Sequence, residues 1–344
     1  MDYRELIEKY NALLEQVDRL TEENIQLKTQ LGLPESELVP KTTSVKNTGR
    51  KIPDDESAQK NRFPSVDRTS DSLSKIRLFM SLFKGREDVY ANRWENKNKG
   101  TSGYSPVCLN EWQSGLCKKP KIPCSKCENK FYAALDEGVI ENHLRGSTIA
   151  GIYPMLPDET CCFLAMDFDD TDWQKDISML RDVCVEFSLP IAVERSRSGK
   201  GGHVWFFFEN PLPAALARKF STALITCSMG RRYEIQFKSY DRLFPSQDTM
   251  PKGGFGNLIA LPLQKAAREN KNSEFVDENF QSYGDQWAFL STIQKITEGR
   301  PCEICLWSDR NANEKRRASS DSVHALWPDS VSGQSQKTGR EQTL

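Results

Sequence analysis

The 344-residue sequence predicts an α+β core that follows a small cysteine-rich segment and an N-terminal coiled coil. Short apolar runs bounded by polar residues are typical of buried strands, and the longer amphipathic segments between them favour helices. The runs at 163–166 and 204–208 lie on either side of one such helical segment, at 173–187. Four cysteines close together and leucines that recur every seven residues predict the two preceding parts.

Composition narrows the class of protein. The 47 basic and 48 acidic side chains nearly cancel, so a surface for nucleic acid has to be local rather than global. The sequence has no apolar run near eighteen residues and no signal peptide, which predicts a protein without a membrane partner. Ten cysteines without secretory features indicate a reducing, cytoplasmic location, where clustered cysteines bind metal more often than they form disulfides.

Residues 1–32 carry a heptad repeat that predicts a coiled-coil helix and self-association. Asn24 at an a position favours a parallel two-stranded register. Apolar residues at e positions leave a trimer open, as well as packing on another helix or on the chain's own domain. Residues 33–72 are polar and predict a disordered linker. The d positions of the repeat are Leu6, Leu13, Leu20 and Leu27.

Residues 73–145 combine a helical pattern, which begins at Leu73 and which the segment 85–94 could continue, with a group of cysteines. Four thiolates within twenty residues, closing on a CxxC, suit a structural zinc site, and His143 could replace one of them. Reduced thiols buried in a loop-rich segment are the alternative. The lysines between the cysteines predict a basic knob that could touch a phosphate backbone. The predicted zinc ligands are Cys108, Cys117, Cys124 and Cys127.

The region 146–299 is predicted to form the core, and a pair of aspartates lies at the end of its first strand. Residues i and i+2 of a strand share a face, so Asp167 and Asp169 point the same way while Phe168 points into the core. Two adjacent carboxylates repel one another unless a cation lies between them, and hard oxygen ligands suit Mg²⁺ or Mn²⁺. The alternative is a solvated turn.

A glycine-rich turn follows between two further strands. Backbone N–H groups and cations of such a turn can surround phosphate oxygens. A flexible hairpin loop is the alternative, and SGKGG is not a Walker A motif because no GKS/T precedes a helix. The candidate phosphate-binding and catalytic residues here are Arg195, Arg197, Ser198, Lys200 and His203.

A third carboxylate has three candidates, Glu234, Asp241 and Asp248, and periodicity alone does not separate them. The pattern predicts a helix at 214–228, a strand at 258–261 and a terminal helix at 286–296. Residues 300–344 are predicted to be a disordered tail, in which the lone CxxC at Cys302 does not indicate a metal site.

These motifs, taken together over about residues 75–297, resemble the archaeo-eukaryotic primase superfamily, and in particular the primase domain of TOTE conflict systems. The resemblance is specific because several long motifs agree in order. They are YSPVCLNEW, the cysteine group, HLRG, GIYPMLPDETCCFLAMDFDD, SGKGGHVWFFF and FPSQDTMPKGGFGNLIALPLQ.

The resemblance implies an RRM-like antiparallel sheet with flanking helices, and metal-dependent, template-directed nucleotidyl transfer by a DNA primase or primase-polymerase. It implies that Asp167, Asp169 and Asp241 bind Mg²⁺ or Mn²⁺, and that Ser198 and His203 hold the nucleotide phosphates. The implied partners are nucleoside triphosphates and a single-stranded or primed DNA template.

Such systems usually continue into a helicase, and the sequence has no Walker A motif, so a helicase acting in trans is a further expectation. Two other classes of function stay open. One is a catalytically silent, zinc-stabilised dimeric DNA-binding module, and the other is a metal-dependent nuclease. The sequence does not separate de novo priming from extension, or ribonucleotides from deoxynucleotides.

Overall fold

The computed structural model describes residues 65–229 and 239–310, together with Arg19. Apart from Arg19, these residues belong to one compact unit, Asn61–Leu344. The predicted coiled coil, most of the predicted linker, Glu234 and residues 311–344 lie outside the described residues. Within the described part, no helix is both long enough and apolar enough to span a membrane.

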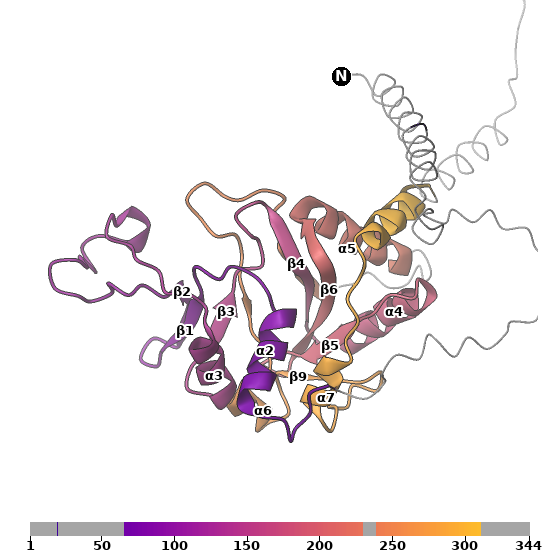
Figure 1. Cartoon of the computed structure of the whole chain (residues 1–344), viewed down its shortest axis with the longest axis horizontal. Coiled ribbons are helices and arrows are strands. Elements are labelled where there is room, and N and C mark those ends of the chain that lie inside the picture. The colour runs from indigo at the N-terminus through magenta and orange to yellow at the C-terminus, as the bar shows by residue number, and fades with distance from the viewer. Residues whose placement is uncertain (1–18, 20–64, 230–238, 311–344) are drawn as a thin grey trace, which may run out of the picture. The chain divides into compact units, whose positions relative to one another are not determined.

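A five-stranded antiparallel sheet forms the centre of the unit, with strand order β7-β4-β6-β5-β9 (Figure 1). Neighbouring strands are paired along their length, and the longest ladder joins the two central strands from Thr160↔Pro213 to Asp169↔Gly201. The strands are β4 (Thr160–Asp169), β5 (Ala192–Arg195), β6 (Gly201–Pro213), β7 (Tyr240–Phe244) and β9 (Glu274–Phe275).

Two helices, α4 (Trp173–Glu186) and α5 (Ala214–Met229), cover one face of this sheet. Along the chain the elements run β4-α4-β5-β6-α5-β7, so each helix crosses over one intervening strand, as in the split β-α-β unit. Alternate residues of β4 and β6, among them Phe168 and Phe206, pack against Leu180 and Phe220 in one buried cluster. The predicted α+β class with an antiparallel sheet is confirmed.

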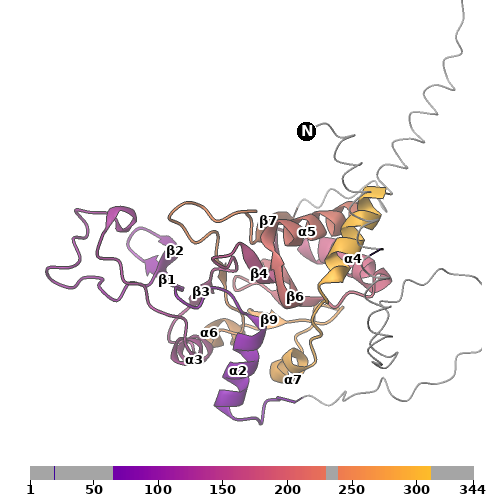
Figure 2. The ribbon, with the colours of Figure 1, turned by 45° about the horizontal axis from the view of Figure 1, so that its top comes forward.

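The opposite face carries a second layer (Figure 2). There Phe163, Trp205 and Phe207 pack against Phe83 and the helices around it, with Phe83 edge-on to Trp205 at 5.0 Å between ring centroids. This layer contains the helices α2 (Ser72–Leu82), α3 (Glu137–Arg145), α6 (Lys265–Arg268) and α7 (Gln286–Ser291). Its small sheet, in the order β2-β1-β3-β8, consists of β1 (Ala91–Asn96), β2 (Thr101–Pro106), β3 (Ala150–Ile152) and β8 (Ile259–Ala260).

Three boundaries differ from the sequence-based expectations. The segment 91–106 forms a hairpin rather than continuing a helix, because its turn is made at Gly100 with φ +61° and β1 finds a partner in β3. The expectation of disorder from residue 300 is wrong for residues 300–310, which are helical and bury Ile304. The linker prediction is too long, because Asp71 already caps α2 by accepting a hydrogen bond from the Ser74 N–H.

Candidate active site

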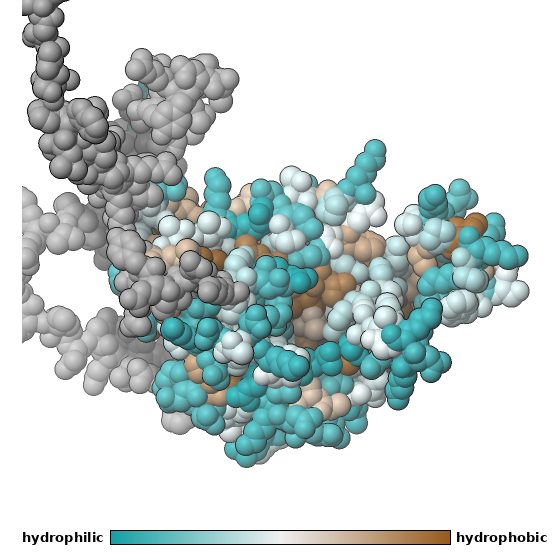
Figure 3. All heavy atoms as spheres, turned by 180° about the vertical axis from the view of Figure 1, so that it is seen from behind, coloured by the Kyte–Doolittle hydropathy of each residue, from teal (hydrophilic) through white to brown (hydrophobic). Residues whose placement is uncertain are grey.

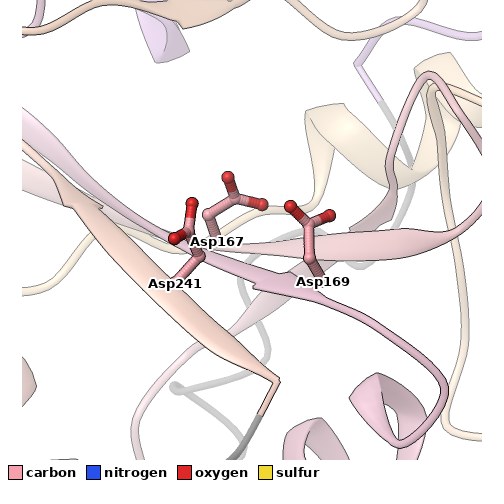
Figure 4. A group of neighbouring side chains, drawn as sticks. All are labelled: Asp167, Asp169 and Asp241. Carbon is pink, nitrogen blue, oxygen red and sulfur yellow. The ribbon is translucent and has the colours of Figure 1, made fainter.

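Three carboxylates meet at one end of the central sheet, where one oxygen from each of Asp167, Asp169 and Asp241 lies within 4.8 Å of the others (Figure 4). Asp167 and Asp169 come from the last residues of β4. Phe168 between them is fully buried on the opposite face, which is the alternation that the DFD pattern predicts. The arrangement matches the hard oxygen donors that Mg²⁺ or Mn²⁺ prefers.

A β-bulge brings the third aspartate to this face. On β4, Asp167 is opposite Arg242 and Phe168 is opposite Tyr240, so Asp241 is the extra residue of β7 at the register shift. In a regular ladder the side chain of Asp241 would point to the face that α4 and α5 cover, away from Asp167. Of the other two candidates, Asp248 pairs with Arg218 outside the cluster, and Glu234 is not described.

The electrostatics of the cluster favour a cation. Burial raises the pKa of Asp169, and the neighbouring charges of Asp167 and Asp241 raise it further. The guanidinium of Arg242 pairs with the carboxylate of Asp241, which offsets part of this repulsion. A divalent ion would relieve the remainder, because it stabilises the ionised form of every carboxylate that it touches.

His203 stands directly opposite Asp167 on β6, with its Nε2 atom 3.4 Å from Asp167 Oδ1. Its Nδ1 atom is 2.9 Å from Glu194 Oε2. Burial alone lowers the pKa of His203, but the carboxylates of Glu194 and Asp167 outweigh burial and raise it to about 10. With a carboxylate near each ring nitrogen, the protonated form of His203 is favoured, and that form has no free lone pair with which to act as a base.

Glu194 is a site residue that the sequence-based reasoning missed. Its side chain is 2% exposed, and it accepts hydrogen bonds from the indole N–H of Trp205 at 3.1 Å and from the Ser273 hydroxyl at 3.2 Å. These two donors and His203 give both oxygens of the buried carboxylate hydrogen-bond partners. A signal was present in the sequence, because Glu194 and His203 flank the short turn and become cross-strand partners once the hairpin closes.

The glycine-rich turn places polar groups beside the aspartates. Ser198 and Lys200 line a cavity of about 510 Å³ together with Asp169, Trp173 and two neighbouring residues of the β4–α4 loop. The turn closes with Gly199 at φ +75°. A Cβ atom on Gly201, where β6 begins, would lie 2.3 Å from the Phe168 carbonyl oxygen, so only glycine permits this close approach to β4.

The two arginines of the turn are not brought to the carboxylates. Arg195 donates its guanidinium hydrogen bonds to the backbone oxygens of Lys271 at 2.8 Å and Phe280 at 2.6 Å. These carbonyls already hold the side chain, and its role in phosphate binding stays a prediction. Arg197 is half-buried and forms a hydrogen bond with the Tyr104 hydroxyl of β2.

The four predicted zinc ligands line a single cavity of about 80 Å³. Their sulfur atoms are not drawn together, since among the described residues only the aspartates bring three ligand atoms within 4.8 Å of one another. Tetrahedral zinc needs thiolates about 3.8 Å apart, given Zn–S bonds of about 2.3 Å. His143 is not an alternative ligand, because it is fully buried, with Nε2 2.9 Å from Pro262 O and Nδ1 accepting from the Ala150 N–H at 3.1 Å.

Comparison with known proteins gives one family match. Residues 74–303 match the family described as "TOTE conflict system, Archaeo-Eukaryotic Primase domain". No curated protein sequence matches the chain. A solved structure, the polymerase domain of Mycobacterium tuberculosis ligase D in complex with DNA, is 13% identical and has a TM-score of 0.35. The alignment covers 70% of this chain and 85% of that one.

Proposed function

The chain belongs to the archaeo-eukaryotic primase domain family of TOTE conflict systems, and on that premise we propose that it catalyses metal-dependent, template-directed nucleotidyl transfer. The observation that carries the proposal is the convergence of Asp167, Asp169 and Asp241 beside His203 and a cavity lined by Ser198 and Lys200. The template would be single-stranded or primed DNA, and the substrates would be nucleoside triphosphates.

The three aspartates would hold one or two Mg²⁺ or Mn²⁺ ions, since their oxygens already lie within 4.8 Å of one another. When bound, such ions would neutralise charge on the reacting phosphate and on the attacking and leaving oxygens. The ions would also allow the negatively charged DNA and triphosphate to approach, because the three carboxylates would otherwise repel them. Arg242 fixes the carboxylate of Asp241 at the outer side of the cluster.

The protein's own donors would hold the triphosphate. Ser198 and Lys200 are exposed at the cavity beside Asp169, where a hydroxyl and an ammonium can bind phosphate oxygens. His203 would act as a fixed positive charge and hydrogen-bond donor, because Glu194 holds its Nδ1 side and leaves Nε2 directed toward the carboxylates. In this role it would orient a phosphate rather than remove a proton.

We also propose a structural zinc site in the cysteine-rich segment. A zinc ion would draw Cys108, Cys117, Cys124 and Cys127 together, since all four thiols already line one cavity. Metal analysis of the purified protein, beside a Cys124→Ser/Cys127→Ser variant, tests this directly. Self-association through residues 1–32, a helicase partner and a role in conflict remain predictions from the sequence, and light scattering of the chain with and without residues 1–32 tests the first of them.

The decisive experiment is nucleotide incorporation on a single-stranded DNA template with Mg²⁺ or Mn²⁺, in the presence and absence of a primer. Asp167→Ala and His203→Ala are the test variants. Asp172→Asn is the matched control, because Asp172 is exposed and is not part of the carboxylate cluster. We expect incorporation in the wild type and the control, and its loss in Asp167→Ala.

The outcomes separate the candidate functions. Incorporation with release of pyrophosphate identifies synthesis, and the lane without primer shows whether the protein also starts strands. Shortening of the template without nucleotide indicates a nuclease. If the wild type binds DNA and incorporates nothing with either metal, the enzyme proposal is wrong and a binding module takes its place.

A further inference from the structure

The cysteine-rich loop, residues 108–132, projects from the small sheet (Figures 1 and 2). It is closed at its base, where Cys108 and Tyr132 form an antiparallel bridge and the Leu109 N–H donates to the Phe131 carbonyl at 2.7 Å. The Tyr132 ring anchors this base by packing edge-on against Phe255 at 5.0 Å. The loop is therefore attached to the body at one end and free to present its outer side chains.

Exposed apolar side chains gather on this loop. Ten large apolar residues are exposed in the described part of the chain, and four of them lie here. Trp112 is 69% exposed and Phe131 is 61% exposed. Leu109 stands opposite Phe131 in the ladder, so the two share the face turned away from Cys108 and Tyr132, which line the cavity. Figure 3 shows apolar surface bordered by hydrophilic surface on the projecting lobe.

The backbone conformation of Trp112 is not explained by burial of its side chain. Its backbone lies in the left-handed region at φ +63°, an unfavourable conformation for a bulky residue. Such conformations persist where the surroundings impose them and gather at functional sites. The Lys119 ammonium lies 5.7 Å from the centre of the indole ring, and Glu111 pairs with the same ammonium at 2.6 Å. The indole is thus held outward beside a positive charge.

The loop is also basic. Five lysines and two glutamates lie between Cys108 and Tyr132, in a chain whose total charge is nearly zero. Four of these lysines are exposed and have no carboxylate within salt-bridge distance among the described residues. They are Lys118, Lys121, Lys126 and Lys130.

We propose that this loop binds single-stranded DNA, with Trp112 and Phe131 stacking on unpaired bases and the exposed lysines contacting phosphates. Exposed aromatic rings interspersed with cations fit a single strand, because bases stack on the rings only when they are free of a duplex. The loop is joined to the catalytic site through β2, whose Tyr104 forms a hydrogen bond with Arg197 of the glycine-rich turn. The choice of DNA over RNA rests on the proposed function, whereas the surface itself does not.

The test is binding rather than catalysis, so it can fail while the proposed function stands. Fluorescence anisotropy would measure binding of labelled oligo(dT), oligo(U) and a DNA duplex of equal length to the full chain, without nucleotide, Mg²⁺ or Mn²⁺. We expect Trp112→Ala/Phe131→Ala to weaken oligo(dT) binding at least tenfold, since each stack is worth about 1–3 kcal/mol, or about 5- to 150-fold.

Three further variants separate base stacking from phosphate contacts as the cause of binding. Trp307→Ala, which removes an exposed tryptophan of the helix at 299–310, should bind like the wild type. Trp112→Phe keeps a stacking ring and should retain affinity within a few-fold even where the alanine variant folds poorly. Changing Lys118, Lys121 and Lys126 to glutamine should reduce the salt dependence, by a slope of about 0.7 per lost phosphate contact.

Four results would overturn the proposal. They are unchanged oligo(dT) binding in the double alanine variant, equal affinity for the duplex, tighter binding of oligo(U), and binding to anionic vesicles without binding to oligonucleotides. The first two would remove the stacking argument, the third would assign the loop to RNA, and the fourth would make it a lipid surface.

Discussion

Replacement of Glu194 is the sharpest test of how the site is built. Its carboxylate accepts hydrogen bonds from His203, Trp205 and Ser273 in a position that is 2% exposed. Glu194→Ala would leave all three donors without an acceptor and the imidazolium of His203 without its closest counter-charge. Each unsatisfied buried donor costs about 1–3 kcal/mol, and breaking a buried ion pair costs about 3–5 kcal/mol. Since these costs overlap, we expect the free energy of unfolding to fall by about 3–5 kcal/mol.

Glu194→Gln separates charge from hydrogen bonding. The amide oxygen at the position of Oε2 can still accept from both His203 and Trp205. The amide NH₂ group can then donate to the Ser273 hydroxyl, which can accept in place of donating. Every hydrogen bond is kept and the negative charge alone is lost. We expect a fall of about 1–2 kcal/mol, the difference between charged and neutral hydrogen bonds.

Urea unfolding at pH 7, read by circular dichroism, measures these free energies. Glu209→Ala on the neighbouring strand β6 is the control, because Glu209 is exposed and should change stability by no more than about 0.5 kcal/mol. A Glu194→Ala protein as stable as the wild type would refute the reasoning. So would a Glu194→Gln protein as unstable as Glu194→Ala, because hydrogen bonding would then not explain the difference.

Three more predictions concern neighbouring features. Gly201→Ala should destabilise the protein by about 1–3 kcal/mol or more, because the new Cβ would meet the β4 backbone; Gly284→Ala, where a Cβ has open space, is the control in the same unfolding assay. Burial lowers the pKa of His143 to about 4, so between pH 6.5 and 4 the unfolded chain binds more protons and stability falls as pH falls, by about 2 kcal/mol at pH 5. The free energy of unfolding of His143→Gln, measured between pH 7 and pH 5, should not show this loss. Equal pH dependence of the two proteins would contradict the prediction. Asp169→Asn should stabilise the metal-free protein, since burial and the charges of Asp167 and Asp241 disfavour the ionised form of Asp169. The same variant should abolish the rise in melting temperature that Mn²⁺ causes in the wild type. Thermal unfolding with and without Mn²⁺ measures both effects, and a variant that keeps the Mn²⁺ shift would count against the metal site.

The local parts of the site could be predicted from the sequence because they depend on short-range geometry. Period-two alternation places Asp167 and Asp169 on one face whatever surrounds the strand. The close spacing of Glu194 and His203 around a glycine-rich turn makes them partners in a hairpin, and the helical pattern at 173–187 agrees with α4. The family match over residues 74–303 agrees with the resemblance that these motifs carry.

Other features depend on contacts between distant segments, which no local pattern records. Asp241 joins the cluster through a one-residue bulge in the pairing of β4 with β7, and a shift of one residue reverses which face a side chain occupies. The hydrogen bonds of the Arg195 guanidinium to the Lys271 and Phe280 carbonyls likewise arise only in the folded chain. Composition and periodicity thus determined the central strands β4 and β6, the helices α4 and α5, and most of the candidate residues. Tertiary packing alone decided which of those side chains meet, because hydrogen bonds between residues 76 and 85 positions apart depend on the whole fold rather than on local sequence.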